Sequence, residues 1–393
     1  MALRVSKDSI DLRKKLSELE RPIGLKGNEL MRSDTVQDAR DLVSAGRKNM
    51  IINGQTFINQ RNTGSYTIPH ATGGSYGGPD RWAINEATDG SVSVNMDGDP
   101  SSGNAAGSNV KEFTKAMQIA CSGADVSLGS TQNLHFFQNI EGYNTLGLKW
   151  GTVNASDVTL SFWVRSNVPG TYCVGLENSA TNRCCIKEYT IDTGFDWQKK
   201  VLTFPGCKDG TWVKDSGIGI RVRFCLATGD SYDDGIDGEW ITNDELSTPN
   251  QVNWMTSTNN RFFITGVQLE KGKNATEFEH RTYAEELALC HRYYWNVPNA
   301  RWLMGYKRHD NQTFFQLDTP VPMRASPTPT IDSVGIFTNH QTALGGSVQT
   351  TCSVFEYRPD AGRGTLRVDS TYSGTHTTIP SWEAGTIEFS AEL

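Results

Sequence analysis

The sequence predicts a mainly β protein: an antiparallel β-sandwich of the jelly-roll type, followed by a smaller C-terminal β-domain and preceded by short N-terminal helices. Short runs of alternating apolar and polar residues recur at intervals near ten residues, which is typical of antiparallel sandwiches. Glycine is abundant, with 38 of 393 residues, and aromatic residues make up 10% of the chain. This composition favours many short strands, tight turns and aromatic packing over long helices.

The length of the chain suggests two or three domains. We expect an N-terminal helical segment at residues 1–46, a sandwich at residues 47–290 and a C-terminal β-domain at residues 291–393. No internal repeat of fixed period is visible in the sequence, which argues against a stacked β-helix.

The N-terminal segment has helical periodicity and little apolar surface. A heptad pattern holds apolar residues at Val5, Leu12, Leu16 and Leu19. Two heptads are too short to form a stable isolated helix in water. The helix therefore either lies on a neighbouring domain or joins copies of the chain in a bundle. We favour oligomerisation, or docking onto a partner.

The sandwich strands are expected from residue 49 onward. The pattern at residues 158–165, VTLSFWVR, is the clearest, and it predicts Leu160, Phe162 and Val164 on the core face. Residues 134–140 are either helical or extended. The other expected strands are 49–63, 81–85, 91–96, 113–122, 148–150, 171–177, 185–191, 199–204 and 218–227.

The stretch from Ile264 to Trp295 closes the sandwich. Alternation predicts a last strand with Ile264 on one face and Val267 and Leu269 on the opposite face. From residue 282 the period changes to that of a helix, with Glu286 among its polar positions. The expected apolar face of this helix comprises Tyr283, Leu287, Cys290 and Tyr294.

Six strands are expected after this helix, at residues 301–308, 313–317, 328–333, 347–357, 365–368 and 385–391. Four prolines between residues 320 and 329 break any helix there and favour an extended connection.

Several of these strings resemble one known family. VQLEKG at residues 267–272, followed by FEHR-Y--EL--C-RYY, resembles the sandwich-closing segment of tail fibres and other virion appendage proteins of tailed bacteriophages. MIINGQTFINQR at residues 50–61, VPMRASPT at residues 321–328 and the final TIEFSAEL resemble the same family. The sandwich of that family is similar to the carbohydrate-binding jelly rolls of glycoside hydrolases. Residues 29–44 also resemble the link upstream of fibre domains.

The resemblance implies a virion protein, a short tail fibre or adhesin, made in the host cytoplasm and located in the tail appendage. It implies a homotrimer that attaches to other phage tail proteins through its N-terminal segment and binds host cell-surface polysaccharide. The two other hypotheses are a structural adaptor or collar protein without receptor contact, and a glycan depolymerase.

Charge and composition argue against other classes of protein. The 37 basic and 44 acidic residues give a net charge of −7, so no nucleic-acid partner is expected, because such binding uses clustered Lys and Arg. No apolar run reaches the roughly 20 residues of a membrane span, so no membrane insertion is expected. The eight cysteines form no CxxC pair and are expected to be reduced and buried.

An acidic loop at residues 229–245 is the first candidate for a site. Its aspartates supply hard oxygen ligands suited to calcium, although their spacing is not that of an EF-hand. The alternative is a solvated loop of repelling carboxylates, and no other cofactor is expected. The candidate calcium ligands are Asp230, Asp233, Asp234 and Asp237.

The same loop carries aromatic residues beside carboxylates. An aromatic ring covers the apolar face of a sugar while polar groups bind its hydroxyls. Trp82, Trp163 and Trp197 lie in strand patterns and are expected in the core instead. The candidate carbohydrate-binding residues are Tyr232, Asp233, Asp234, Trp240 and, from the loop at residues 70–82, Tyr76.

We expect no catalysis. A glycosidase needs two carboxyl groups on either side of the scissile bond, and no spacing in the sequence pairs two of the available glutamates, Glu177 among them. No GxSxG, HExxH or P-loop motif occurs. Glu270, Glu279 and His280 lie in the family-like segment, where we expect them, with Arg281, to connect the sheet to the helix.

Overall fold

The computed structural model describes residues 48–62, 64–97, 109–192, 195–297, 303–309, 312–332, 336–339, 347–358, 361–370, 380–382 and 386–393. The chain divides into two compact units between Lys48 and Asn49, and the fold described below is that of the second unit. The predicted oligomerisation residues Val5, Leu12, Leu16 and Leu19 lie outside the described residues.

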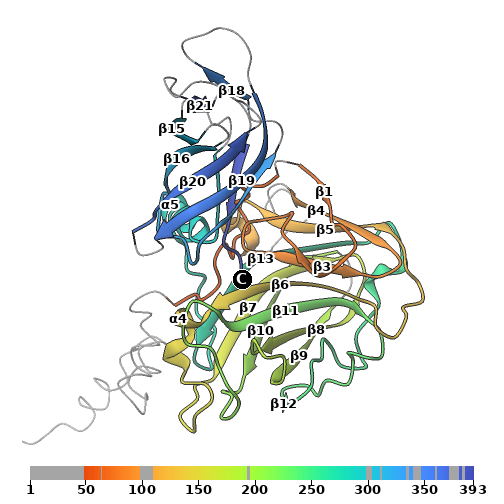
Figure 1. Ribbon diagram of the computed structural model, residues 1–393. Coiled ribbons are helices and arrows are strands. Elements are labelled where there is room, and N and C mark those ends of the chain that lie inside the picture. The colour runs from red at the N-terminus through yellow and green to blue at the C-terminus, as the bar shows by residue number, and fades with distance from the viewer. Residues whose placement is uncertain are drawn as a thin grey trace, which may run out of the picture. The chain divides into compact units, whose positions relative to one another are not determined.

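Two antiparallel sheets form the sandwich (Figure 1). The six-stranded sheet has the order β1 (Tyr66–Thr67), β4 (Ser91–Asp97), β5 (Ala116–Gly123), β13 (Arg261–Lys271), β7 (Val158–Ser166) and β10 (Gln198–Phe204). The seven-stranded sheet has the order β12 (Trp240–Ile241), β9 (Cys184–Ile191), β8 (Gly170–Glu177), β11 (Ile218–Thr228), β6 (Asn133–Glu141), β3 (Ala83–Ala87) and β2 (Ala71–Ser75). The predicted fold class is confirmed.

One hydrophobic core joins the two sheets. Leu160, Phe162 and Val164 of β7 are all fully buried in it, as the alternation of that strand predicted. Trp82 is buried in the same core, whereas Trp197, with the partly buried Trp163 against it, belongs to a separate cluster with Phe263.

Strand β13 departs from the predicted alternation. Its pairing with β7 shifts register between Thr265 and Gln268, so a β-bulge adds one residue and reverses the faces beyond it. Ile264, Val267 and Leu269 therefore all enter the main core, and the prediction of opposite faces is wrong. Gly266 adopts φ 62° at the bulge, and a Cβ there would lie 2.5 Å from the Phe113 ring.

The opening segment is also not a strand. The structure has no strand at the described residues 49–62, because Asn53 folds the chain locally. Its backbone has φ 56°, and its side-chain oxygen accepts the N–H groups of Phe57 and Ile58, each at 3.1 Å. Thr56 follows with φ 54°. Apolar alternation alone did not reveal this turn.

The helices in the described residues are short. Residues 148–150, predicted as a strand, lie at the end of a 3₁₀ turn instead, and residues 134–140 lie in strand β6. The helical elements are η2 (Asn109–Glu112), α4 (Gly142–Thr145), η3 (Leu146–Leu148), η4 (Trp254–Thr256) and α5 (Tyr283–His291). None of these helices is long and apolar enough to cross a membrane.

Helix α5 follows the sandwich as predicted, but the exposure of two of its residues differs from the prediction. Thr282 caps it in a capping box with Glu285. Cys290 is fully buried, whereas Tyr283, expected on the apolar face, is 59% exposed. Glu286, expected on the polar face, is only 4% exposed. Its burial requires a partner.

The C-terminal part contains two further groups of strands. One is a three-stranded sheet of β14 (Tyr294–Val297), β22 (Thr386–Ser390) and β17 (Thr328–Asp332). In the other, six strands close on themselves in the order β15 (Leu303–His309), β16 (Gln312–Asp318), β20 (Arg363–Ser370), β19 (Ser347–Arg358), β18 (Ile336–Asn339) and β21 (Pro380–Trp382). The short strands β14, β18 and β21 were not predicted.

Buried charges connect the three-stranded sheet to the sandwich. Glu392 accepts hydrogen bonds from Arg61 and Arg81. Arg292 binds both oxygens of Glu141, at 2.9 and 2.6 Å. Such bidentate pairs fix orientation as well as contributing energy.

Candidate functional site

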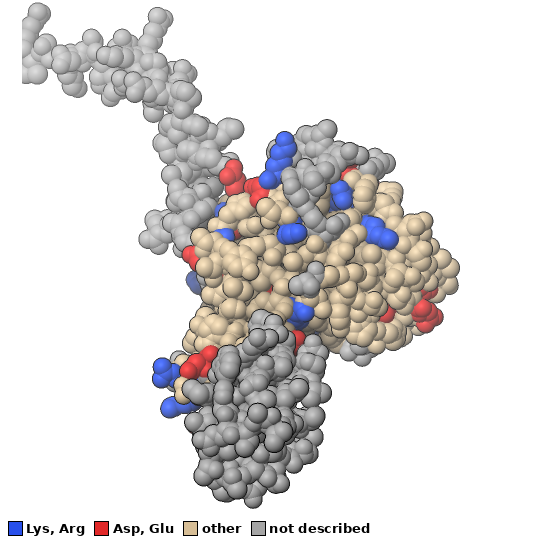
Figure 2. Space-filling view, turned by 90° about the horizontal axis from the view of Figure 1, so that it is seen from above, with Lys and Arg blue, Asp and Glu red and all other residues tan. Residues whose placement is uncertain are grey.

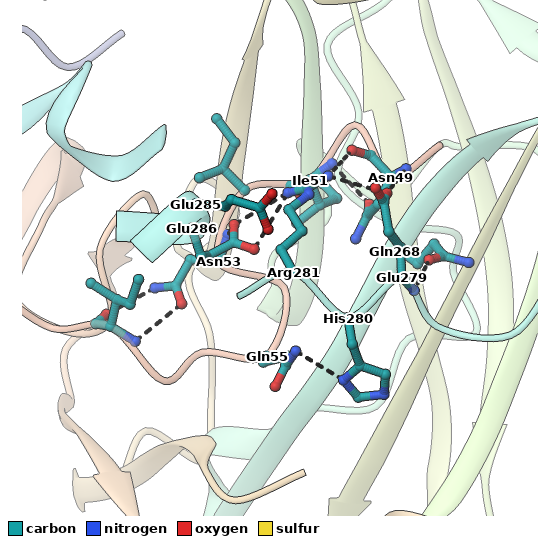
Figure 3. A network of polar contacts seen from close by, with 12 residues as sticks. Asn49, Ile51, Asn53, Gln55, Gln268, Glu279, His280, Arg281, Glu285 and Glu286 are labelled. Atoms are coloured by element: carbon teal, nitrogen blue, oxygen red, sulfur yellow. Dashed lines mark hydrogen bonds and ion pairs between the residues drawn. The ribbon is translucent and has the colours of Figure 1, made fainter. Parts of the chain in front are cut away.

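The family-like segment around Arg281 is a structural clamp (Figure 3). The Arg281 guanidinium donates to the carbonyl oxygens of Ile51 and Asn49 and contacts the carboxylates of Glu279 and Glu286. Glu286 in turn accepts the Asn53 N–H at 2.5 Å. These groups connect the opening segment, the end of β13 and helix α5, which is the role predicted for Arg281 and Glu279.

The other residues of that segment that resemble a catalytic set are also structural. Glu270 accepts hydrogen bonds from Thr276 and Gln268 within its own connection. His280 points away from the Glu279 carboxylate toward Gln55, at 3.1 Å (Figure 3), and its other ring nitrogen lies 3.3 Å from Glu112. Glu270, Glu279 and His280 therefore do not converge on a common point.

A second polar cluster lies on the outer face of the seven-stranded sheet. Arg223 donates to Asp244 at 2.8 Å and to Glu177 at 2.9 Å, and Arg221 donates to the other oxygen of Glu177 at 2.8 Å. Glu177 is fully buried. This arrangement is nearly neutral in charge, because two carboxyl groups face two guanidinium groups.

The two carboxyl groups of this cluster also hydrogen-bond to each other. Burial raises the pKa of Glu177 to about 7, against the opposing charge of Arg223. Burial also acts on Asp244, but Arg223 and the hydrogen bond with Glu177 bring its pKa below the usual value.

Three tryptophans gather at one end of the sandwich. The rings of Trp150, Trp212 and Trp240 meet edge to face in all three combinations, with centroids 4.7, 5.3 and 5.6 Å apart. Each indole N–H donates to a backbone carbonyl oxygen: Trp150 to Ser156, Trp212 to Asp209 and Trp240 to Pro205. Because every N–H is satisfied, the three rings are fixed in orientation.

The loop that carries Trp212 is held from both sides. Arg183 binds both oxygens of Asp209, at 2.9 and 3.0 Å, and this places the Asp209 carbonyl that accepts the Trp212 N–H. The Gly151 N–H donates to the Cys207 carbonyl oxygen at 2.9 Å. Gly151 has φ 80°, and a Cβ there would lie 2.8 Å from the Gly210 carbonyl oxygen. A side chain at this glycine would separate the two loops.

These loops enclose a small pocket beside the tryptophans. The space that it encloses is about 20 Å³, roughly the room for one water molecule. Trp150 and Trp212 and four aliphatic side chains form its floor and walls, and Lys149 and Lys214 complete its lining. The aliphatic and remaining residues are Leu146, Leu148, Val213, Ile220 and Thr145. Leu146 is 49% exposed, and Tyr143, three residues earlier in the chain, is 56% exposed.

The structure distributes the predicted carbohydrate-binding residues over several places. Trp240 belongs to the tryptophan cluster. Tyr232 is half-buried and packs against a small cluster that includes Ile186 and Leu246. Tyr76 lies under the Arg61 guanidinium and donates to the Leu393 carbonyl oxygen at 3.2 Å. Its contacts are therefore with the C-terminal residues.

Trp150 and Trp212 were not predicted as site residues. Both lie between strands, in the strings LKWGT and DGTWVK. Both rings are buried in the main core, at 4% and 7% exposed, and of the three tryptophans only Trp240 is partly exposed.

The acidic loop does not gather its four aspartates. Asp237 binds Lys187 at 3.2 Å and accepts the Glu188 N–H at 2.9 Å. Burial and the charges of Asp234 and Asp230 raise the pKa of Asp233. Across the described residues, no group of three or more His, Cys, Asp or Glu side chains is arranged to hold a metal ion. Calcium binding thus has no support from this geometry.

Charged side chains are scattered over the surface that Figure 2 shows. Among the described residues visible on this face, Lys and Arg stand singly or in small groups between uncharged residues, with Asp and Glu interspersed. This face does not carry the continuous basic patch that nucleic-acid binding uses.

Comparisons with known proteins gave matches to solved structures only. No family model and no curated protein matches the sequence. The enzymatically active domain of bacteriophage CBA120 tailspike protein 4 is 11% identical, with a TM-score of 0.29, and the match covers 57% of this chain and 21% of that chain. A putative sugar binding protein from Bacteroides thetaiotaomicron is 12% identical, with a TM-score of 0.28, covering 57% and 100%.

A third similar structure is the family 11 carbohydrate-binding module from Clostridium thermocellum in complex with a β-1,3-1,4-mixed-linked tetrasaccharide. It is 12% identical, with a TM-score of 0.26, and the match covers 55% of this chain and 99% of that module. At these TM-scores the similarity carries no argument about function. The sandwich architecture stands on the strand order and core described above.

Proposed function

We propose that this protein is a non-catalytic carbohydrate-binding protein of a bacteriophage virion, and that its tryptophan pocket contacts host-surface polysaccharide. One observation carries the proposal. The partly buried ring of Trp240 packs against the buried rings of Trp150 and Trp212, each with a satisfied N–H group, and exposed Leu146 lines the small pocket beside them. Rigid aromatic and apolar surface beside polar groups is what sugar rings bind.

The proposed place in the virion rests on the resemblance of residues 267–294 and 321–328 to tail appendage proteins. In this proposal residues 1–46 attach the chain to other tail proteins and join three copies in a homotrimer. Three pockets on one appendage would bind a repeating polysaccharide together. Weak single contacts would then give useful avidity.

The absence of catalysis is part of the proposal. It is supported by the pairing of buried Glu177 with Arg221 and Arg223, which engages both of its carboxylate oxygens. It is also supported by the separate structural roles of Glu270, Glu279 and His280. A reducing-sugar assay on host polysaccharide should detect no release by the purified protein.

The test is a glycan array of bacterial surface polysaccharides, followed by calorimetry on the bound glycan. Trp212→Leu removes one ring of the tryptophan cluster, and Trp197→Leu removes an equally buried ring from another cluster as the matched control. We expect at least a tenfold loss of affinity for Trp212→Leu and none for Trp197→Leu, in variants shown by circular dichroism to be folded. If no glycan binds, or if both variants bind like the wild type, the proposal is wrong.

A further inference from the structure

Two cysteines face each other across neighbouring strands of the seven-stranded sheet. Cys173 of β8 and Cys225 of β11 are direct partners in the antiparallel register, and both are fully buried free thiols. Directly opposed residues lie on the same face of a sheet, with Cβ atoms roughly 4.5–5.5 Å apart. A disulfide needs Cβ atoms about 3.5–4.5 Å apart, so a shift of about 1 Å would bring the two sulfur atoms into bonding distance.

One glutamine side chain bridges the backbones of the two cysteines. The Gln251 side-chain oxygen accepts the Cys173 N–H at 2.8 Å, and its side-chain nitrogen donates to the Cys225 carbonyl oxygen at 3.4 Å. Because a single amide group reaches both residues, they are close together independently of the strand register. The pair is therefore held in place by the loop that carries Gln251 as well as by the sheet.

The other cysteines in the described strands have no cysteine opposite them. Cys184 and Cys185 are neighbours in β9, so their side chains point to opposite faces of the sheet. Cys207 and Cys290 lie outside the strands. The strand partners are Val92 for Cys121, Glu177 and Ile241 for Cys184, Leu176 and Trp240 for Cys185, and Val368 for Cys352.

The acidic loop covers the Cys173–Cys225 pair. Leu246 belongs to the same buried cluster and Tyr232 packs against it, while the Thr248 N–H donates to the Cys173 sulfur at 3.4 Å. Burial raises the pKa of Cys173 to about 11, so the closed form holds very little thiolate, which is the reactive species. A reagent in solution therefore reaches the pair when the loop opens locally.

We propose that Cys173 and Cys225 form a cross-strand disulfide when the protein meets an oxidising medium, and that the bond locks β8 to β11 beneath the acidic loop. A reducing cytoplasm keeps such a pair as thiols. The inference is independent of glycan binding, because it concerns the covalent state and stability of the sandwich.

The oxidant in this step is a low-molecular-weight disulfide such as oxidised glutathione. The thiolate of one cysteine attacks its S–S bond, forming a mixed disulfide and releasing one reduced glutathione. The sulfur of the second cysteine then attacks the mixed disulfide and releases another reduced glutathione. The two cysteines thus lose two electrons, and their two protons end on the two glutathione thiols.

The experiment incubates full-length protein in two glutathione buffers, one with an excess of the reduced form and one with an excess of the oxidised form. Free thiols are then alkylated in denaturant, and the protein is digested with trypsin without reduction and analysed by mass spectrometry. Trypsin cleaves after Lys and Arg, so Cys173 falls in peptide 166–183 and Cys225 in peptide 224–261, each with a single cysteine. A covalent adduct of these two peptides therefore identifies the bond.

We expect the linked peptides in the oxidised buffer and the two separate alkylated peptides in the reduced buffer. The bond should raise the Tm by roughly 5 °C, because it restricts the unfolded chain. Cys225→Ala should abolish both the link and the rise in Tm. The matched control, Cys121→Ala, changes a buried strand cysteine outside the pair and should keep both.

The variant Tyr232→Ala tests the case in which the loop merely keeps the oxidant out, because loss of this ring opens the cover. If peptides 166–183 and 224–261 stay separate after oxidation of both the wild type and Tyr232→Ala, the inference is wrong. A mixed disulfide with glutathione that persists on either cysteine would also overturn it, since the second sulfur would then be out of reach.

Discussion

The indole rings of Trp150 and Trp212 meet edge to face, with centroids 4.7 Å apart and an angle of 72° between the planes. Trp150 precedes strand β7 in the chain and Trp212 follows strand β10, so the two rings come from separate loops. Trp240 closes the cluster, so the aromatic surface depends on all three positions. The first prediction concerns the accessible part of that surface.

Leu146→Ala should weaken glycan binding without affecting stability. Leu146 lines the pocket and is 49% exposed, so the truncation removes apolar contact area but leaves no internal cavity. We expect about a three- to tenfold loss of affinity by calorimetry and a free energy of unfolding within about 0.5 kcal/mol of wild type. Val126→Ala, at a site that is 72% exposed, is the control. Equal affinities of the two variants would count against the pocket.

Tyr232→Ala should have the opposite effect. Its ring packs against Ile186 and Leu246, so truncation should lower the free energy of unfolding by about 2 kcal/mol and leave glycan affinity unchanged. Trp240→Ala should lower both quantities, because Trp240 supports the other two rings. Urea denaturation and calorimetry measure the two effects. If Tyr232→Ala kept normal stability but lost glycan binding, the binding site would instead lie in the acidic loop.

The Arg281 clamp should be a major contributor to stability. The side chains of Arg281 and Glu286 are 6% and 5% exposed. Arg281→Met should cost about 3–5 kcal/mol, because it leaves the buried carboxylate of Glu286 without its cation. Glu239→Gln, at an exposed position, is the control for a change of charge. If chemical denaturation shows a change below about 1 kcal/mol, the clamp does not have this role.

Glu177 should make stability depend on pH. Its pKa is about 7 in the folded protein and about 4.3 in the unfolded chain, so the folded state binds more protons between these values. Stability from this group is therefore present below about pH 4 and is lost as the pH rises through 7. Buried His135, whose pKa is lowered to about 3, acts in the opposite sense, since it favours the folded state as the pH rises toward 6.5.

The difference between wild type and Glu177→Gln isolates this effect. We expect the variant to gain relative stability from pH 4.5 to pH 8, on the order of 3 kcal/mol at most. Thermal unfolding across this range measures the difference, with His135 present in both proteins. A difference that is constant with pH would mean that Arg221 and Arg223 keep Glu177 ionised throughout.

Calcium should not stabilise the protein. Asp237 is committed to Lys187 and to the Glu188 N–H, so the aspartates of the acidic loop do not form a common site. We expect the same Tm with millimolar calcium and with chelator. A rise in Tm with calcium that Asp233→Asn abolishes would establish a site in this loop.

The sandwich could be predicted because its strands are long enough to alternate and are half-buried. Strand β7 is the clearest case, with Leu160, Phe162 and Val164 all in the core. The bulge in β13 could not be predicted, because its extra residue is defined by pairing with β7 and by the positive φ of Gly266. The turn at Asn53 was missed because the apolar residues around it alternate with polar ones, as they would in a strand.

The candidate site was predicted only in part. Trp240 was recognised as an aromatic residue in a polar loop, but its partners Trp150 and Trp212 come from distant loops that only the fold brings together. The burial of Glu286 was missed for a similar reason, since Arg281 and the Asn53 N–H that satisfy it are not evident from helical periodicity.

The most direct test of the central claim is a fluorine NMR titration of protein labelled with 5-fluorotryptophan. The chain has ten tryptophans, and single substitutions assign their resonances. On addition of the glycan identified by the array, we predict that the resonances of Trp240 and of Trp150 and Trp212, which pack against it, shift, while those of Trp82 and Trp254, outside this cluster, stay constant. Saturating binding that leaves the three resonances unshifted would contradict the proposed site.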